Sequence, residues 1–145
     1  MIHEYLIVNT LNESDQMQLI ELYRNEFWCN TRQCHDVETM LKNTDIVVGV
    51  KTNENELIGF VRVLTDYVYK ATIYDLIVHP NWRKRNVGKL LMDTIISHRD
   101  LKNIEHIDLS CLPAMCPFYE KWGFTTEMGE LGFMRKFNKK NRVDY

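Results

Sequence analysis

The sequence predicts an α/β protein built on one sheet, because short apolar runs alternate along the chain with segments of helical periodicity. The 145 residues are close to the commonest domain size, and no repeat, low-complexity tract or linker divides them. Apolar residues make up 45% and charged residues 26%, which excludes disordered, collagen-like and membrane-spanning classes. We therefore expect a single domain over residues 1–145.

The first elements expected are a strand and two helices. The apolar run within 2–9 suits a strand. Ser14 offers an N-cap for the first helix. Apolar residues recur at helical spacing after it, namely Leu19, Ile20, Tyr23 and Phe27. A second helix is expected over about 35–43.

Three strands and a third helix follow. The apolar runs 46–50 and 57–64 flank a polar turn and indicate a hairpin. The next strand, 71–78, ends before Pro80, because proline cannot extend a central ladder. The third helix shows one apolar face, formed by Val87, Leu90, Leu91, Thr94 and Ile95.

The last part of the chain predicts a strand, a short helix and a hairpin. Apolar and polar residues alternate over 106–111, which is typical of a strand. Helical spacing then relates Met115, Phe118, Tyr119 and Trp122, and Gly123 supplies the stop. Strands over 124–126 and 133–137 would close the sheet before a polar tail from 138 onward. The expected order is β-α-α-β-β-β-α-β-α-β-β.

Charge and the N-terminal residues restrict partners and location. The net charge of -2 and the pI of about 6.2 argue against broad electrostatic capture of nucleic acid. Residues 1–6 lack the basic region and apolar run of a signal peptide, and no apolar stretch approaches the ~20 residues of a membrane-spanning helix. We therefore expect a cytoplasmic location, with no nucleic-acid or membrane partner.

The four cysteines form two Cys-x4-Cys pairs, Cys29 with Cys34 and Cys111 with Cys116. A zinc site that includes His35 is one interpretation, but the spacing is loose and buried inert thiols are the more common case. Another interpretation pairs Cys111 or Cys116 with His106 as nucleophile and base, which sequence alone supports weakly. We expect structural thiols and no metal.

The most informative stretch is 74–91, where an apolar strand runs through a basic loop into an amphipathic helix. Unpaired N–H groups and the helix dipole make such a helix start an anion site, phosphate above all. Four basic side chains surround it, namely Arg83, Lys84, Arg85 and Lys89. The loop has neither the dinucleotide-binding nor the P-loop glycine pattern, which disfavours those nucleotide sites.

Two motifs resemble those of the GCN5-related N-acetyltransferases. The first is Val78-x-Pro80-x-x-Arg83-x-x-Asn86-Val87-Gly88-x-x-Leu91, similar to motif A, whose loop Gln/Arg-x-x-Gly-x-Gly/Ala holds the acetyl-CoA pyrophosphate. The second is Phe118-Tyr119-Glu120-Lys121-Trp122-Gly123-Phe124, similar to motif B. The resemblance covers about residues 5–137 and implies a mixed, mostly antiparallel central sheet flanked by helices.

The resemblance implies acetyl-CoA as co-substrate and a set of residues around it. These are Ile77, Val78, Arg83, Lys84, Arg85, Asn86, Val87, Gly88 and Lys89. The family's first loop glycine is Asn86 here, and Lys84 stands at another position that is often glycine. Asparagine tolerates the left-handed conformation, so the turn can form, although its side chain can crowd the pyrophosphate.

The implied chemistry is direct acetyl transfer from CoA to an amine, without an acyl-enzyme. An alkyl ammonium has a pKa of roughly 10.4, so a base or a water chain must take its proton. Asp75 is the candidate base and Asp66 the second choice. A strand amide at about Ile77 or Val78 would stabilise the thioester oxygen, and Tyr119 would protonate the leaving thiolate.

The family places the acceptor beside residues that correspond to Phe27, Trp28, Tyr67 and Tyr69, and aromatic rings can hold a cation or a flat ring. We expect a small-molecule primary amine as the acceptor. A protein or peptide N-acetyltransferase, or a CoA-binding domain without turnover, remains an alternative. The segment 62–66 also looks like one from a bacterial and plastid branch of the family. The last strands of the family can pair between chains, so a homodimer is an option.

Overall fold

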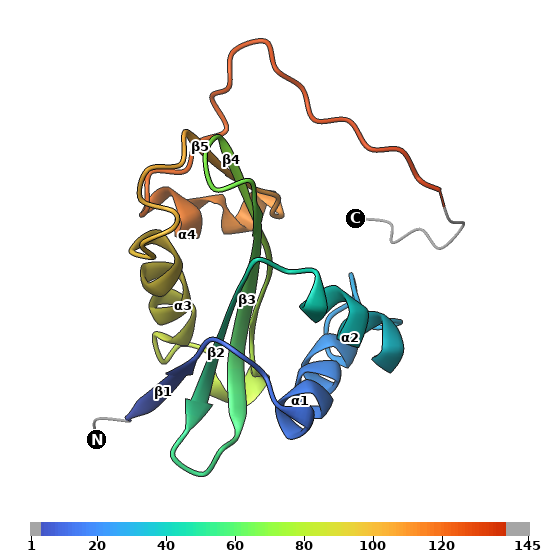
Figure 1. Ribbon diagram of the computed structural model, residues 1–145. Coiled ribbons are helices and arrows are strands. Elements are labelled where there is room, and N and C mark those ends of the chain that lie inside the picture. The colour runs from blue at the N-terminus through green and yellow to red at the C-terminus, as the bar shows by residue number, and fades with distance from the viewer. Residues whose placement is uncertain (1–3, 139–145) are drawn as a thin grey trace. The chain divides into compact units, whose positions relative to one another are not determined.

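The computed structural model describes residues 4–138 and confirms the α/β class (Figure 1). The chain divides into two compact units, Met1–Ser110 and Cys111–Tyr145. The first unit contains the sheet and three helices, and the second contains the short helix α4 (Cys116–Glu120). The start of the first predicted strand and nearly all of the polar tail lie outside the described residues.

The sheet has five strands in the order β1-β2-β3-β4-β5. Their bounds are β1 (Tyr5–Val8), β2 (Ile46–Thr52), β3 (Leu57–Thr65), β4 (Lys70–Val78) and β5 (His106–Leu109). The first four strands pair in antiparallel fashion, and β5 pairs parallel to β4. The expected mixed, mostly antiparallel sheet is therefore confirmed.

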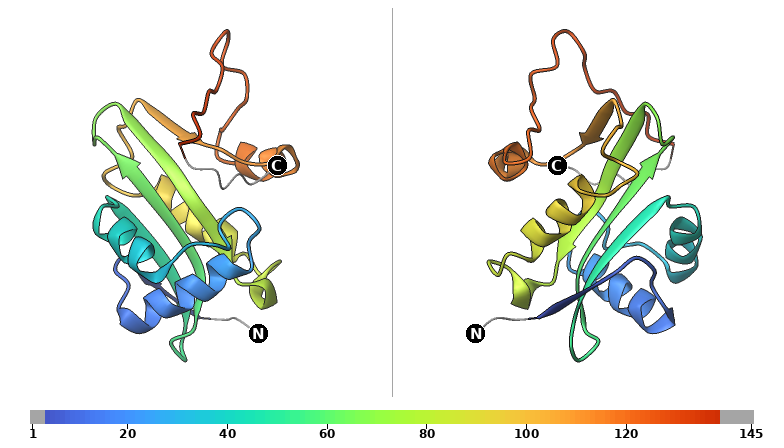
Figure 2. Two further views of the ribbon diagram at one scale, coloured as in Figure 1. Left: turned by 90° about the vertical axis from the view of Figure 1, so that its right-hand side faces the viewer. Right: turned by 60° about the vertical axis from the view of Figure 1, so that its left-hand side comes forward.

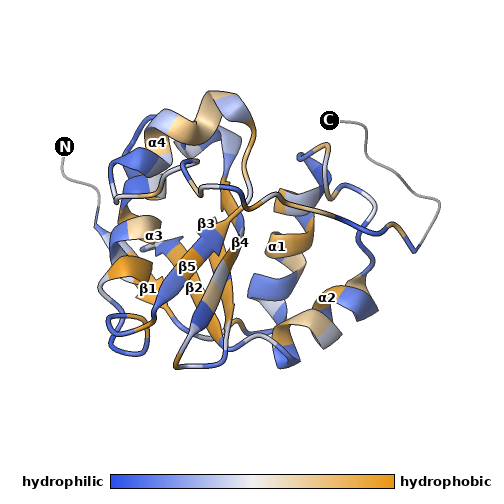
Figure 3. Cartoon of the chain, turned by 90° about the horizontal axis from the view of Figure 1, so that it is seen from above, coloured by the Kyte–Doolittle hydropathy of each residue, from blue (hydrophilic) through white to orange (hydrophobic). Residues whose placement is uncertain are grey.

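Helices cover both faces of the sheet. On one face lie α1 (Glu13–Arg24) and α2 (Cys34–Lys42), and on the other lies α3 (Val87–Ile96) (Figure 2). Figure 3 shows the same arrangement from above, with hydrophobic segments in the strands. Burial of apolar side chains from both layers forms the core beneath α1, which includes Leu19, Tyr23, Phe60 and Ile77. No helix within residues 4–138 is long and apolar enough to cross a membrane.

Gly59 lets the start of α3 pack closely on β3. A Cβ atom at this position would lie 2.8 Å from Val87 Cγ1 and 3.1 Å from Leu91 Cδ1, which is closer than carbon atoms normally approach. The missing side chain therefore fixes how near the first turn of α3 comes to the sheet.

The first helix begins earlier than predicted. Its N-cap is Asn12, whose side-chain oxygen accepts a hydrogen bond from the Asp15 N–H at 2.8 Å. Asp15 Oδ2 accepts the Asn12 N–H at 3.1 Å in return. This reciprocal capping box places Ser14 inside the first turn, so the prediction of Ser14 as the cap was wrong. The helix ends at Arg24, which leaves Phe27 outside it.

The predicted closing hairpin is absent from the described residues. No strand lies within residues 124–138, and Leu131, Phe133 and Met134 are exposed. An isolated two-stranded hairpin is marginally stable without an apolar face to pack against, and here these side chains find none. The strand predicted over 106–111 also ends early, at Leu109.

Candidate functional site

The turn between β4 and α3 contains two residues in the left-handed conformation. Lys84 has a φ of 61° and Asn86 a φ of 63°. Most residues avoid positive φ, whereas glycine adopts it freely. These are the two positions where motif A commonly has glycine, so this loop keeps the glycine-type backbone without glycine. The expectation that Asn86 can preserve the turn is confirmed.

The N-terminus of α3 has no cap from its own side chains. Asn86 is the N-cap residue, but its side chain makes no capping hydrogen bond, and the first turn contains no acidic residue. The N–H groups of Val87, Gly88 and Lys89 lack intrahelical acceptors because of their position at the helix start. The helix dipole adds partial positive charge there. This helix start can therefore hold an anion through its backbone.

The basic side chains around the turn are partly engaged within the protein. Arg83 donates to Glu26 Oε1 at 2.9 Å and to the Val78 carbonyl oxygen at 3.3 Å. Lys89 pairs with Asp93 at 2.6 Å. The Arg85 guanidinium lies 5.0 Å from the centre of the Trp82 ring. Compared with these side chains, the backbone N–H groups of the loop are the better candidates to donate hydrogen bonds to an anion.

The second half of β4 has a free edge within the sheet. Residues 70–73 pair with β5, and the pairing ends at Ile73 opposite Leu109. In an antiparallel ladder, successive residues point their N–H groups to opposite sides. The His79 N–H donates to the Ile58 carbonyl of β3 at 2.8 Å, so the Val78 N–H points toward the free edge. Of the two predicted amides, Val78 therefore faces away from β3.

A bulge in β4 carries Asp75. The register of β4 against β3 shifts here, and Asp75 has a φ of 58°. The side chain is only 3% exposed. Its Oδ2 atom accepts hydrogen bonds from Arg62 Nε at 2.7 Å, Arg32 Nη1 at 2.7 Å and the Tyr23 hydroxyl at 2.9 Å. The bulge thus aims a carboxylate at two guanidinium groups.

The surroundings of Asp75 weigh against its predicted role as a base. Burial alone raises the pKa of Asp75, but hydrogen bonds and charge from Arg32 and Arg62 outweigh it, so this pKa lies below its ordinary value. Burial and the Asp75 charge raise the pKa of Tyr23 far above its ordinary value. The cluster therefore contains an ionised carboxylate and a neutral phenol, and the carboxylate is a weak proton acceptor.

Asp66, the second candidate base, serves the turn between β3 and β4. Its Oδ1 atom accepts backbone N–H groups of Val68, Tyr69 and Lys70 at 2.9, 2.7 and 3.0 Å. These bonds, that of Lys70 first, lower the pKa of Asp66. Asp66 therefore fits a turn-forming role.

Tyr119 lies on α4 in the second unit. Its ring packs edge-on against Phe118, with ring centres 5.0 Å apart. Burial, with a smaller contribution from Cys111, raises the pKa of Tyr119 to about 12. The phenol is therefore protonated at neutral pH, as a proton donor must be.

The predicted acceptor residues do not make contacts that join them into one cluster within residues 4–138. Trp28 joins the Asp75 cluster, because the Arg32 guanidinium lies 5.6 Å from its ring centre and 4.6 Å from that of Tyr23. Tyr67 and Tyr69 are exposed on the turn around Asp66.

Sequence reasoning missed Arg32, Arg62 and Tyr23. A signal existed for one of them, since Arg62 is the one charged residue in the apolar strand 57–65. A buried charge needs a partner of opposite sign, and Asp75 stands in the neighbouring strand. Arg32 comes from the loop after α1, and no local pattern connects it to either strand.

The cysteines fall into different surroundings. The Cys29 thiol is buried and lies 3.6 Å from the Tyr23 carbonyl oxygen, whereas Cys34 is exposed. The sulfur atoms of Cys111 and Cys116 are 3.8 Å apart. Across residues 4–138, no three His, Cys, Asp or Glu side chains gather as a metal site would require.

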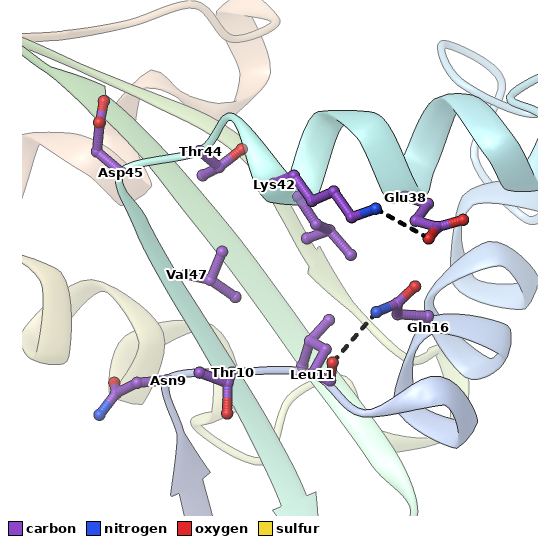
Figure 4. Close-up of a pocket in the computed structure, with 10 residues that line it drawn as sticks. Asn9, Thr10, Leu11, Gln16, Glu38, Lys42, Thr44, Asp45 and Val47 are labelled. Carbon is purple, nitrogen blue, oxygen red and sulfur yellow. Dashed lines mark hydrogen bonds and ion pairs between the residues drawn. The ribbon is translucent and has the colours of Figure 1, made fainter.

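A separate surface cavity of about 410 Å³ opens between β2, α2 and the chain before α1 (Figure 4). Two interactions join residues of its wall, since Lys42 pairs with Glu38 at 3.2 Å and Gln16 Nε2 donates to the Leu11 carbonyl oxygen at 3.2 Å. None of the predicted site residues lines it. The candidate site is therefore the α3 turn with the β4 edge and bulge.

Comparison with known proteins agrees with the motifs. The family model described as acetyltransferase (GNAT) domain matches residues 43–126. The uncharacterized N-acetyltransferase ycf52 of Pyropia yezoensis is 31% identical over 72% of this chain and 65% of its own length. A ycf52-like N-acetyltransferase of Prochlorococcus marinus is 33% identical over 78% of this chain and 64% of its own length.

The fold has a counterpart among solved structures. A structure from Xanthomonas campestris pv. campestris, described as a GNAT-family acetyltransferase, superposes with a TM-score of 0.81. The sequences are 21% identical, and the match covers 94% of this chain and 95% of the other. The two chains therefore share a fold. This chain spans just under two thirds of the length of the two curated relatives above.

Proposed function

The chain belongs to the GNAT acetyltransferase domain family, and from this premise we propose that it transfers an acetyl group directly from acetyl-CoA to a primary amine of a small molecule. The observation that carries the proposal is the uncapped start of α3 behind two left-handed residues, Lys84 and Asn86. Such a backbone suits a diphosphate, because several N–H groups converge where the dipole is positive. The residues present therefore fit acetyl-CoA.

The chemistry needs a stabilised oxygen and a protonated leaving group. The neutral amine nitrogen attacks the thioester carbon, and charge develops on the carbonyl oxygen. The Val78 N–H at the free edge of β4 supplies a preorganised donor for that oxygen. As the carbon–sulfur bond breaks, the Tyr119 hydroxyl gives its proton to the thiolate. The nitrogen, positively charged after its attack, loses a proton to water and becomes the amide, and Tyr119 regains a proton from water. With a pKa raised to about 12 by burial, the Tyr119 phenol carries its proton at neutral pH.

We assign the removal of the ammonium proton to water. Asp75 has a lowered pKa, and two guanidinium groups and a phenol occupy its Oδ2 atom. With water as acceptor, kcat/KM follows the neutral amine and rises about tenfold per pH unit below an amine pKa of roughly 10.4. A plateau across pH 6–9 would instead indicate a side-chain base.

The test is a product assay with a panel of primary amines. Mass spectrometry of each amine after incubation with acetyl-CoA should show the addition of one acetyl group. Thiol release alone is less specific, because the chain has four cysteines. Acetylated peptides without acetylated small amines would indicate a protein acceptor. Binding of CoA without any product would indicate a domain without turnover. Absence of both binding and product contradicts the proposal.

A further inference from the structure

The cluster around Asp75 holds more positive than negative charge. Arg32 and Arg62 both bond to this one carboxylate. Glu26, in the loop after α1, is paired with Arg83 at 2.9 Å. The pKa of Tyr23 is raised, so its phenol contributes no charge. The cluster therefore has a net charge of one positive unit.

The excess charge is poorly exposed to water. The Arg62 side chain is 12% exposed and that of Arg32 is 30% exposed. A charge removed from water is costly unless an opposite charge or hydrogen-bond acceptors replace the solvent. Arg62 bonds to Asp75 through Nε, and its two terminal nitrogens have no hydrogen-bond acceptor within the described part of the chain. Donors are thus left over for a bound anion.

The cluster lies close to the reacting edge of β4 and includes partly exposed side chains. Asp75 and Val78 are three residues apart on one strand, so they lie within roughly 10 Å at about 3.3 Å per residue. The Arg62 guanidinium lies 4.9 Å from the ring centre of Tyr74, which is partly exposed. Trp28 flanks Arg32 in the same way. A molecule that reaches the exposed parts of Tyr74 and Arg32 meets aromatic faces and guanidinium donors together.

We propose that the acceptor amine carries a carboxylate a few bonds from its nitrogen, which binds the guanidinium groups of Arg62 and Arg32. The inference rests on the proposed function and names the acceptor class. A carboxylate carries one negative charge, which balances the cluster, and its planar oxygens match the guanidinium fork. A phosphate dianion would overcompensate the charge. Amines without an anion would leave the charge unbalanced.

The direct test compares ω-amino acids of increasing chain length with their carboxamides as acetyl acceptors. Each pair differs at the carboxylate alone. At saturating acetyl-CoA, we expect kcat/KM to be at least tenfold higher for the best acid than for its amide. Equal or lower values for the acids overturn the proposal. Preference for an aminoalkyl phosphate over the best acid overturns it as well.

Variants test whether Arg62 and Arg32 cause the expected preference for acids. Arg62→Gln should bring the acid-to-amide ratio of kcat/KM close to one, and Arg62→Lys should retain part of it. The matched control is Arg24→Gln, which removes an exposed positive charge from α1 and should keep the wild-type ratio. The CoA dissociation constant shows that each variant is folded. If Arg62→Gln fails to fold, the less buried Arg32→Gln serves the same comparison. An unchanged ratio in the folded variant contradicts the proposal.

Calorimetry separates this inference from the proposed function. Each acid and its amide are titrated into protein saturated with CoA. Selective binding of the acid without acetyl transfer supports the carboxylate site and contradicts the proposed function. Acetyl transfer to amines without any preference for acids supports the proposed function and contradicts the carboxylate site.

Discussion

The starts of α1 and α3 differ in whether side chains of the protein cap their backbone N–H groups. Each leaves backbone N–H groups without intrahelical acceptors. At α1, Asn12 and Asp15 cap each other, and acidic residues occupy the first turn. At α3, the left-handed Asn86 makes no side-chain cap, and the first turn has no acidic residue.

This difference distinguishes a helix start built for stability from one available to a ligand. A side-chain cap contributes about 1 kcal/mol to a helix. The start of α3 lacks that contribution, and its N–H groups are available to a bound ligand. A diphosphate fits this arrangement, since its negative charge replaces both the cap and the acidic first turn.

The largest effect on CoA binding is expected when the start of α3 receives an acidic side chain like those at the start of α1. Asn86→Asp places a carboxylate where the diphosphate is expected to bind. Two like charges about 4 Å apart repel by roughly 1–4 kcal/mol near a protein surface, so the CoA dissociation constant should rise at least tenfold. Titration calorimetry measures it. Asn12→Asp, the same change at α1, is the control and should leave the constant unchanged. Equal affinity in both variants contradicts the account.

Loss of the proposed proton donor should affect turnover without affecting the α3 site. Tyr119→Phe removes the hydroxyl, and we expect kcat to fall about tenfold, equivalent to about 1.4 kcal/mol of barrier. The CoA dissociation constant should stay at the wild-type value. Ser14→Ala, which removes a hydroxyl from the first turn of α1, is the control in the steady-state assay. Wild-type turnover in Tyr119→Phe would exclude the residue from the mechanism.

Removal of the α1 cap should change stability alone. Asn12→Ala should lower the free energy of unfolding by about 1 kcal/mol, because it breaks the capping box. Urea denaturation measures the change, and CoA affinity should not move. Ser14→Ala is the control, since Ser14 is not the cap, and should shift stability by less than about 0.5 kcal/mol. A larger loss in Ser14→Ala would mean that the helix starts at Ser14.

The smallest effect is expected from restoring the family glycine. Asn86→Gly keeps the left-handed turn and removes a side chain that can crowd the diphosphate. We expect CoA to bind severalfold more tightly in calorimetry. An unchanged or weaker dissociation constant would remove crowding from the account.

Periodicity predicted the order of the first nine elements, because apolar spacing determines which faces are buried. It could not identify the true cap of α1, since Asn12 and Ser14 are both good capping residues and the reciprocal bond to Asp15 decides between them. The motif predicted the α3 turn. The left-handed conformation expected at Asn86 is found, and the structure adds the same conformation at Lys84.

The sequence could not show which distant residues meet. Asp75 was predicted as a base from its place on β4, and its contact with Arg32, which comes from a loop 43 residues away, is seen in the structure alone. The closing hairpin was predicted from its apolar residues, yet a strand pattern does not ensure a surface to pack against.

An amide-resolved NMR titration with CoA tests the central claim most directly. We predict that the N–H signals of residues 84–89 shift most on binding, together with that of Val78, while those of residues 13–16 at the start of α1 stay in place. Binding that moves other amides and leaves 84–89 unchanged would contradict the account, as would the absence of any binding.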